Sequence, residues 1–119
     1  MPKVHRSVFL KSAKERWPHL TDRINSENGI LHLEVKHIRD EVQHLIDTGC
    51  EAERREALQF IEQSYRHGDS KVKNAIDVSV VEELEFDDRG KLNRSWAWPI
   101  VPSKLKELYT AFHAFQDER

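Results

Sequence analysis

The chain of 119 residues is poor in cysteine, glycine and proline, with one Cys, four Gly and four Pro. The single cysteine, Cys50, excludes a disulfide framework within the chain and is typical of a reducing compartment. The few glycines leave little material for a phosphate-binding loop, and no Walker or nucleophile-elbow pattern is present. No stretch approaches the roughly 18 apolar residues of a membrane span, and no apolar secretion-signal segment follows the basic start. We therefore expect a cytoplasmic protein.

Hydrophobic residues make up 38% of the chain and charged residues 34%, so charge is high for a globular protein. The apolar residues are nevertheless periodic, which favours a folded chain over a disordered one. The length suits one hydrophobic core, and we expect a single domain over residues 1–119.

Apolar residues recur at steps of three and four along most of the chain, which is typical of amphipathic helices. The clearest stripe predicts a helix over 30–47, with a buried face of Leu31, Val35, Ile38, Val42 and Leu45. Similar spacing predicts helices over 7–25, 51–67, 71–86 and 103–116. Five or six helices with short connections predict an all-α fold, a compact bundle or a short stack of antiparallel helices.

Several residues mark the expected helix ends. Ser7 is a candidate N-cap, Pro18 should break or kink the first helix, and Asn28-Gly29 should stop it. Thr48 with Glu51 matches a capping box for the third helix.

The fourth helix, over 71–86, has a competing interpretation. Asp69 or Ser70 is its expected cap. The run 76–81 alternates and is rich in β-branched residues, so a strand is the competing interpretation. Residues 87–101 are expected to form a long connection, because 88–90 is a turn pattern and Pro99 and Pro102 resist regular structure.

Two E-x-x-H pairs, Glu34 with His37 and Glu41 with His44, resemble half of a carboxylate-bridged di-metal site. Such a site needs these pairs on facing helices, whereas both lie on one predicted helix. A solvated polar stripe explains them as well, and the other histidines lack zinc-type spacing. We therefore expect no metal, no cofactor and no enzymatic activity.

Charge is segregated along the chain. Residues 1–25 carry six Lys/Arg and two acids, residues 26–88 carry seven and sixteen, and residues 89–119 carry six and three. Five acids crowd the expected end of the fourth helix, where the helix dipole disfavours negative charge: Glu82, Glu83, Glu85, Asp87 and Asp88. Either basic segments of the chain fold back onto them (Arg89, Lys91 and Arg94, or Lys11, Lys14 and Arg16), or a basic partner binds them.

Trp96 and Trp98 lie in the expected connection, where aromatic residues either pin a loop to the core or anchor an interface. Their basic neighbours would suit single-stranded nucleic acid. The sixteen acids in the adjoining region argue against nucleic acid, because they repel phosphate.

The segment from Gly68 to Leu84 combines Gly-Asp, Val-Lys-Asn, Val-Ser-Val, an acidic pair and Leu. This pattern resembles that of small helical bacterial immunity proteins of polymorphic or contact-dependent growth inhibition toxin systems. The run Pro102 to Tyr109, a proline followed by an amphipathic helix, is similar to the way those chains finish. The resemblance implies an all-helical, cytoplasmic antitoxin that blocks a toxin domain directly, and it assigns no functional residue.

Charge and resemblance together lead us to expect an immunity protein that covers a basic toxin domain, a nuclease, with an acidic surface. The expected partner-binding residues are Glu82, Glu83, Glu85, Asp87, Asp88, Trp96 and Trp98. Neither nucleic acid nor a membrane is an expected partner. A helical adaptor with an endogenous protein partner is the alternative.

Overall fold

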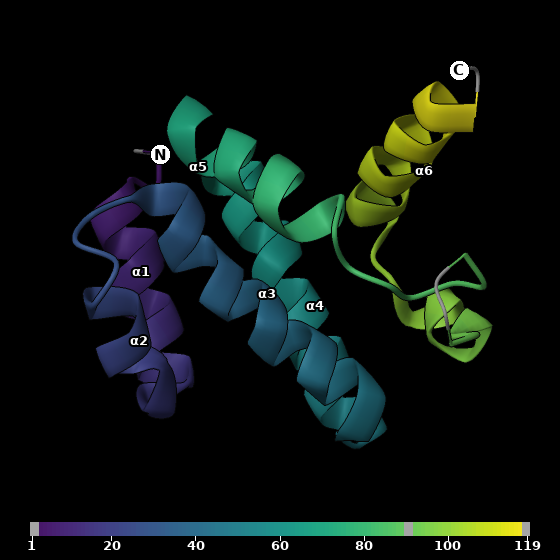
Figure 1. Cartoon of the computed structure of the whole chain (residues 1–119), viewed down its shortest axis with the longest axis horizontal. Helices are drawn as coiled ribbons and strands as arrows, with labels where there is room; N and C mark the ends of the chain where they lie inside the picture. Colours follow the sequence, from purple (N-terminus) through teal and green to yellow (C-terminus); the bar gives the residue numbers. More distant parts are fainter. Residues whose placement is uncertain (1–2, 90–91, 118–119) are drawn as a thin grey trace.

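The computed structural model describes residues 3–89 and 92–117, and within these ranges it contains helices and no strand (Figure 1). The predicted all-α fold is confirmed. Within the same ranges, no helix is both long and apolar enough to cross a bilayer. The elements in chain order are α1 (Arg6–Arg16), η1 (Pro18–Leu20), α2 (Thr21–Asn25), α3 (Leu31–Thr48), α4 (Glu51–His67), α5 (Ser70–Ile76), η2 (Asp77–Val81), η3 (Ser95–Ile100) and α6 (Ser103–Asp117).

The first helix begins earlier than predicted, because the residues before it are held in an extended bridge. The Val4 N–H donates to the His67 carbonyl at 2.7 Å, and the Asp69 N–H donates to the Val4 carbonyl at 2.9 Å. Helix α1 therefore starts at Arg6 with His5 as its N-cap, and the predicted Ser7 cap is wrong.

The predicted break at Pro18 is confirmed. Helix α1 ends at Arg16, and the chain continues as the 3₁₀ turn η1 and the short helix α2. Asn28 and Gly29 adopt positive φ angles of 55° and 84°, so they stop α2 as predicted.

Helices α3 and α4 form the centre of the molecule, with α4 behind α3 in Figure 1. Helix α3 buries Val35, Ile38 and Val42 as predicted, but Leu31 and Leu45 are only half-buried, and Ile46 is fully buried instead. The predicted bounds of α4 are correct. Its buried residues include Ala57, Leu58 and Ile61.

The predicted capping box of α4 is displaced by two residues. Thr48 remains helical and its hydroxyl donates to the His44 carbonyl at 2.8 Å. The box is formed by Cys50 and Glu53, and the Cys50 N–H donates to Glu53 Oε1 at 3.1 Å. Because α3 runs one residue further than predicted and includes Thr48, this residue is unavailable as a cap.

The fourth helix is shorter than predicted and ends in a π turn. Asp69 is its cap and accepts the Val72 N–H at 2.9 Å. Helix α5 gives way at Asp77 to η2, a π-helical segment in which the Asp77 carbonyl accepts the Glu82 N–H at 3.1 Å. The β-branched run is thus helical rather than a strand. It buries Val80 and Val81 in the core.

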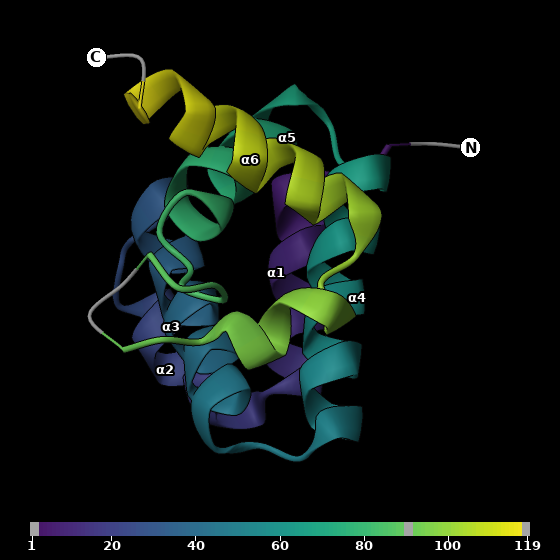
Figure 2. The ribbon, with the colours of Figure 1, turned by 90° about the vertical axis from the view of Figure 1, so that its right-hand side faces the viewer.

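The segment predicted to be an irregular connection contains the 3₁₀ helix η3, and Pro99 lies inside it. Phe86, Trp98 and Tyr109 form an aromatic cluster that ties this segment to α6, with ring centroids 4.4 to 5.9 Å apart. Figure 2 shows η3 and α6 together on one side of the molecule, in front of α1 to α4. Gly90, Lys91 and the side chain of Phe115 lie outside the described residues.

Candidate partner-binding surface

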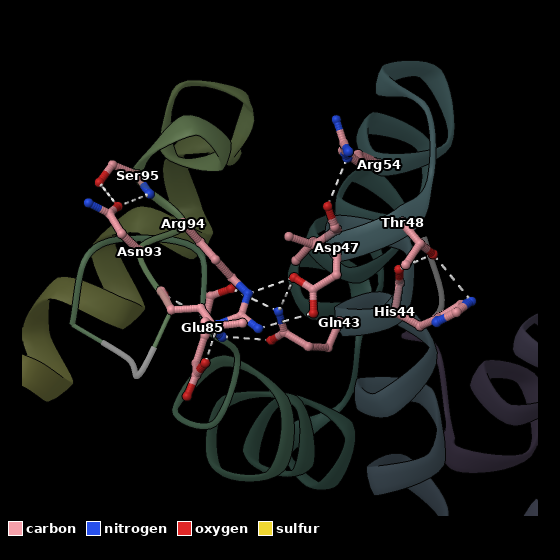
Figure 3. Close-up of polar contacts among 11 residues, drawn as sticks. Gln43, His44, Asp47, Thr48, Arg54, Glu85, Asn93, Arg94 and Ser95 are labelled. Atoms are coloured by element: carbon pink, nitrogen blue, oxygen red, sulfur yellow. Dashed lines mark hydrogen bonds and ion pairs between the residues drawn. The ribbon is translucent and has the colours of Figure 1, made fainter.

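The five acids predicted to bind a partner follow η2, and a glutamine fixes their segment against α3. The Gln43 side chain donates to the Glu85 carbonyl at 3.0 Å and accepts the Glu85 N–H at 2.8 Å (Figure 3). Satisfying both backbone groups of one residue imitates a strand pairing and holds the segment in one register. The acids therefore lie beside the carboxylates of α3.

Arg39 on α3 connects two carboxylates. Its Nε and Nη2 donate to Asp40 at 2.9 and 2.7 Å, and its Nη1 pairs with Glu83. Glu83 and Arg39 are 44 residues apart in sequence. The arginine therefore joins the acidic segment to the polar stripe of α3.

Arg94, which follows the acidic segment in sequence, makes a second bridge and lies between Glu85 and Asp47 (Figure 3). Its Nε and Nη2 donate to the two oxygens of Asp47 at 2.6 and 3.1 Å, and its Nη1 pairs with Glu85. Its backbone N–H donates to the Asp87 carbonyl at 2.7 Å. The hydrogen bonds from Arg94 lower the pKa of Asp47 below its ordinary value. Arg94 is buried, so the pair is less exposed to water than an ordinary surface pair.

The other three acids differ in their surroundings. Asp87 accepts hydrogen bonds from the Tyr109 hydroxyl at 3.1 Å and the Arg89 N–H at 2.9 Å, and burial beside this carboxylate raises the pKa of Tyr109. Glu82 is half-buried, and its pKa is raised by burial and by the nearby Asp77. Asp88 is exposed.

These contacts join the segment 82–89 to the polar side of α3 and to Arg94, and we call the charged residues of this region the acidic strip. It consists of seven carboxylates and three arginines: Asp40, Asp47, Glu82, Glu83, Glu85, Asp87, Asp88, Arg39, Arg89 and Arg94. The expectation that basic residues fold back onto the acids is confirmed for Arg89 and Arg94, whereas Lys91 is outside the described residues. Carboxylates outnumber guanidinium groups, so the strip stays negative after its internal pairing.

The other basic segment considered for this role lies elsewhere. Lys14 donates to the Asn25 side chain at 2.6 Å, and Arg16 lies over the rings of Trp17 and Phe60. Neither neutralises the strip.

The two tryptophans predicted to bind a partner have different environments. Trp98 is half-buried and packs on Phe86 and Tyr109, with ring centroids 5.7 and 5.9 Å away. Trp96 is 49% exposed and its ring lies against the Arg54 guanidinium, 4.4 Å from the ring centroid. Of the two roles that the sequence left open, the structure shows the pinning role for Trp98, whereas Trp96 is exposed.

The E-x-x-H pairs are used inside the protein. Glu34 is only 3% exposed and accepts two hydrogen bonds from Arg6, at 3.0 and 2.7 Å. His19 contacts Glu41 at 2.7 Å. His37 lies 3.2 Å from a carboxylate before α3. Within the described ranges, no group of three His, Cys, Asp or Glu residues is placed to hold a metal ion.

Two further polar arrangements lie outside the acidic strip. His32 Nδ1 lies 2.8 Å from the Ser79 hydroxyl, but Ser79 is buried in the π turn and out of reach of a substrate. An open hollow of about 560 Å³ beside α1 is lined by Lys11 and Lys14. Arg6, which also lines this hollow, donates two hydrogen bonds to Glu34.

Sequence reasoning missed Arg39, Gln43 and Asp47, although their spacing of four places them on one side of α3. The sequence pattern alone predicts that this side of α3 is polar. It does not predict the partner segment, because the contacts join residues more than forty positions apart.

The fold and this surface define the class: a small all-α protein whose charged groups are gathered in a bridged surface strip. A family model for a domain of unknown function, DUF7674, matches residues 10–116, and the chain belongs to this family. The comparisons with curated proteins and with solved structures give no match.

Proposed function

We propose that this protein is an immunity protein, a cytoplasmic antitoxin that binds a cognate secreted toxin domain and covers its active site. The toxin is a basic nuclease, and the acidic strip takes the place of its phosphate substrate. The observation that carries the proposal is that two arginines join the acidic segment to carboxylates of α3, and that the carboxylates of the strip still outnumber its arginines. Inhibition is by occupancy and requires no reaction.

The bridging arginines favour this role by fixing the carboxylates before binding. Glu83 and Glu85 are held by Arg39 and Arg94, yet both side chains remain 43% exposed. A preorganised array loses less side-chain freedom on association than free carboxylates do. The excess negative charge also attracts a basic partner over long range and speeds its association.

Co-expression with the product of the gene immediately upstream tests the proposal. We expect that product to be toxic alone, and survival to be restored by this protein together with a stable co-purifying complex. Toxicity that persists in its presence, or the absence of a complex, would contradict the proposal.

A charge-reversal pair tests the role of the strip. Glu82→Lys with Asp88→Lys changes two strip carboxylates that make no ion pair with an arginine among the described residues. The paired Glu83 and Glu85 are left intact, so the fold is preserved. We expect the association rate at low salt to fall about tenfold or more, because rim charges act mainly on association.

The matched control is Glu15→Lys with Glu56→Lys, which makes the same charge change on exposed positions of α1 and α4. It should leave the association rate nearly unchanged. Circular dichroism verifies that both variants fold. Equal effects of the two pairs would show that net charge, rather than the strip, governs binding.

A further inference from the structure

An exposed tryptophan stands at the end of the acidic strip. Trp96 is the second residue of η3 and follows Arg94, the residue that pairs with Asp47 and Glu85. Its neighbour Ala97 is fully buried, so η3 is fixed on its inner side while Trp96 points outward. The same short helix thus packs one tryptophan, the half-buried Trp98, against the core and leaves the other exposed.

Trp96 is held in place before any partner binds. The Arg54 guanidinium lies 4.4 Å from the ring centroid, and Arg54 Nε donates to the Ile46 carbonyl at 2.9 Å (Figure 3 shows the Arg54 contact). That hydrogen bond fixes the guanidinium plane at the end of α3, and the stack fixes the indole ring. A large aromatic surface is therefore exposed with little rotational freedom left to lose.

The pair also presents unused hydrogen-bond donors. Among the described residues, neither the indole N–H of Trp96 nor the terminal guanidinium nitrogens of Arg54 have an acceptor. A partner that covers the ring must supply an acceptor to these donors, because burying them unpaired is unfavourable. The complementary surface is an apolar recess with a carbonyl or carboxylate oxygen at its edge.

We propose that Trp96, positioned by Arg54, is the specificity-determining anchor of the interface, and that the partner of the acidic strip buries it in such a recess. This inference rests on the proposed function, because the partner is the same basic toxin domain. The acidic strip determines the association rate of the partner, and Trp96 determines its dissociation rate. Tryptophans that fill a recess commonly dominate binding energy, whereas surrounding charges contribute less.

The experiment is a kinetic comparison of variants against the purified cognate toxin domain. Trp96→Ala should raise the dissociation rate about 30-fold, the loss typical of a central tryptophan, and change the association rate less than about twofold. Trp96→Phe retains a ring for the stack and should lose less. Arg54→Ala leaves the indole present but unfixed, and should give a smaller increase than Trp96→Ala.

The matched control is Ile30→Ala, because Ile30 is similarly exposed, at 55%, but lies at the opposite end of α3. Its dissociation rate should equal that of the wild type. Should Trp96→Ala fail to fold, Trp96→Phe and Arg54→Ala still test the anchor, because each should raise the dissociation rate if the indole ring and its stacking on Arg54 contribute to binding.

A wild-type dissociation rate for Trp96→Ala, with toxin protection intact, would overturn the anchor and leave the proposed function standing. A wild-type protein that neither binds nor protects would instead remove the proposed function. Binding of a single-stranded oligonucleotide that Trp96→Ala abolishes would also overturn the anchor, because it would make Trp96 a base-stacking platform.

Discussion

Arg94 illustrates at the scale of one residue how the strip is assembled. It comes from the segment after the acids, yet it contacts Asp47 on α3, 47 residues away, and Glu85, nine residues away. Without Arg94, both Asp47 and Glu85 would lose the cation that pairs with them. Its role is therefore structural as well as electrostatic.

Replacing Arg94 by Ala should lower the free energy of unfolding by about 2 kcal/mol, between the cost of breaking an exposed pair and a fully buried one. Urea unfolding measures this loss. The control is Arg55→Ala, which breaks an exposed pair with Glu51 on α4 and should cost less than about 1 kcal/mol. Similar losses in both variants would show that partial burial adds nothing to the Arg94 bridge.

At the scale of elements, α6 is attached through the aromatic cluster rather than through a long helix interface. Tyr109 packs on Phe86 with ring centroids 4.4 Å apart, and its hydroxyl donates to Asp87 at 3.1 Å. One residue thus links α6 both to the core and to the acidic strip.

Tyr109→Phe should lower the free energy of unfolding by about 1 kcal/mol, because it removes one hydrogen bond and leaves the packing in place. Tyr109→Ala should cost about 3 kcal/mol, since it also empties the cluster. Amide hydrogen exchange should be faster in α6 of the Ala variant than in α3. Tyr65→Phe is the control, because the Tyr65 ring packs under Lys73 and Lys104 and needs no hydroxyl for that contact. A loss in Tyr65→Phe equal to that in Tyr109→Phe would contradict the role of the Asp87 bond.

At the scale of the whole molecule, carboxylates with opposite pKa shifts shape the response to acid. The pKa of Asp47 is lowered by Arg94, and that of Asp69 by the Val72 N–H and by His5. Burial raises the pKa of Asp77, and burial with Asp77 raises that of Glu82. The two sets contribute to stability in opposite directions as pH falls.

The raised pair favours the folded state once protonated. Its contribution grows as pH falls through the folded-state pKa values and is complete below the ordinary values of 3.8 and 4.5. The lowered pair stabilises the fold above its ordinary value of 3.8, and this stabilisation is lost as pH falls through the lower folded-state values. We therefore expect the free energy of unfolding first to rise slightly and then to fall on acidification.

Urea unfolding between about pH 7 and pH 3 checks this profile. Asp77→Asn should raise stability at neutral pH and reduce the initial rise, whereas Asp47→Asn should keep the rise and soften the later fall. If the free energy of unfolding of Asp77→Asn rose on acidification as much as that of the wild type, the rise would come from groups other than Asp77.

The sequence by itself determined the all-α fold and most helix positions. Steps of three and four located the buried face of α3 and the bounds of α4, Pro18 fixed the break after α1, and Asn28-Gly29 fixed the stop of α2. These features depend on contacts within a few residues and on the backbone preferences of single residues. These features can therefore be predicted from the sequence without knowledge of the tertiary structure.

The tertiary structure alone decided the caps, the π turn and the organisation of the candidate site. The bridge between Val4 and Gly68 displaced the first cap, and burial of Val80 and Val81 turned a strand-like run into a helical one. The partners of the acids come from α3 and from Arg94, and the two tryptophans diverge because one side of η3 faces the core. Such contacts join distant residues, and their energies depend on burial, which no local pattern encodes.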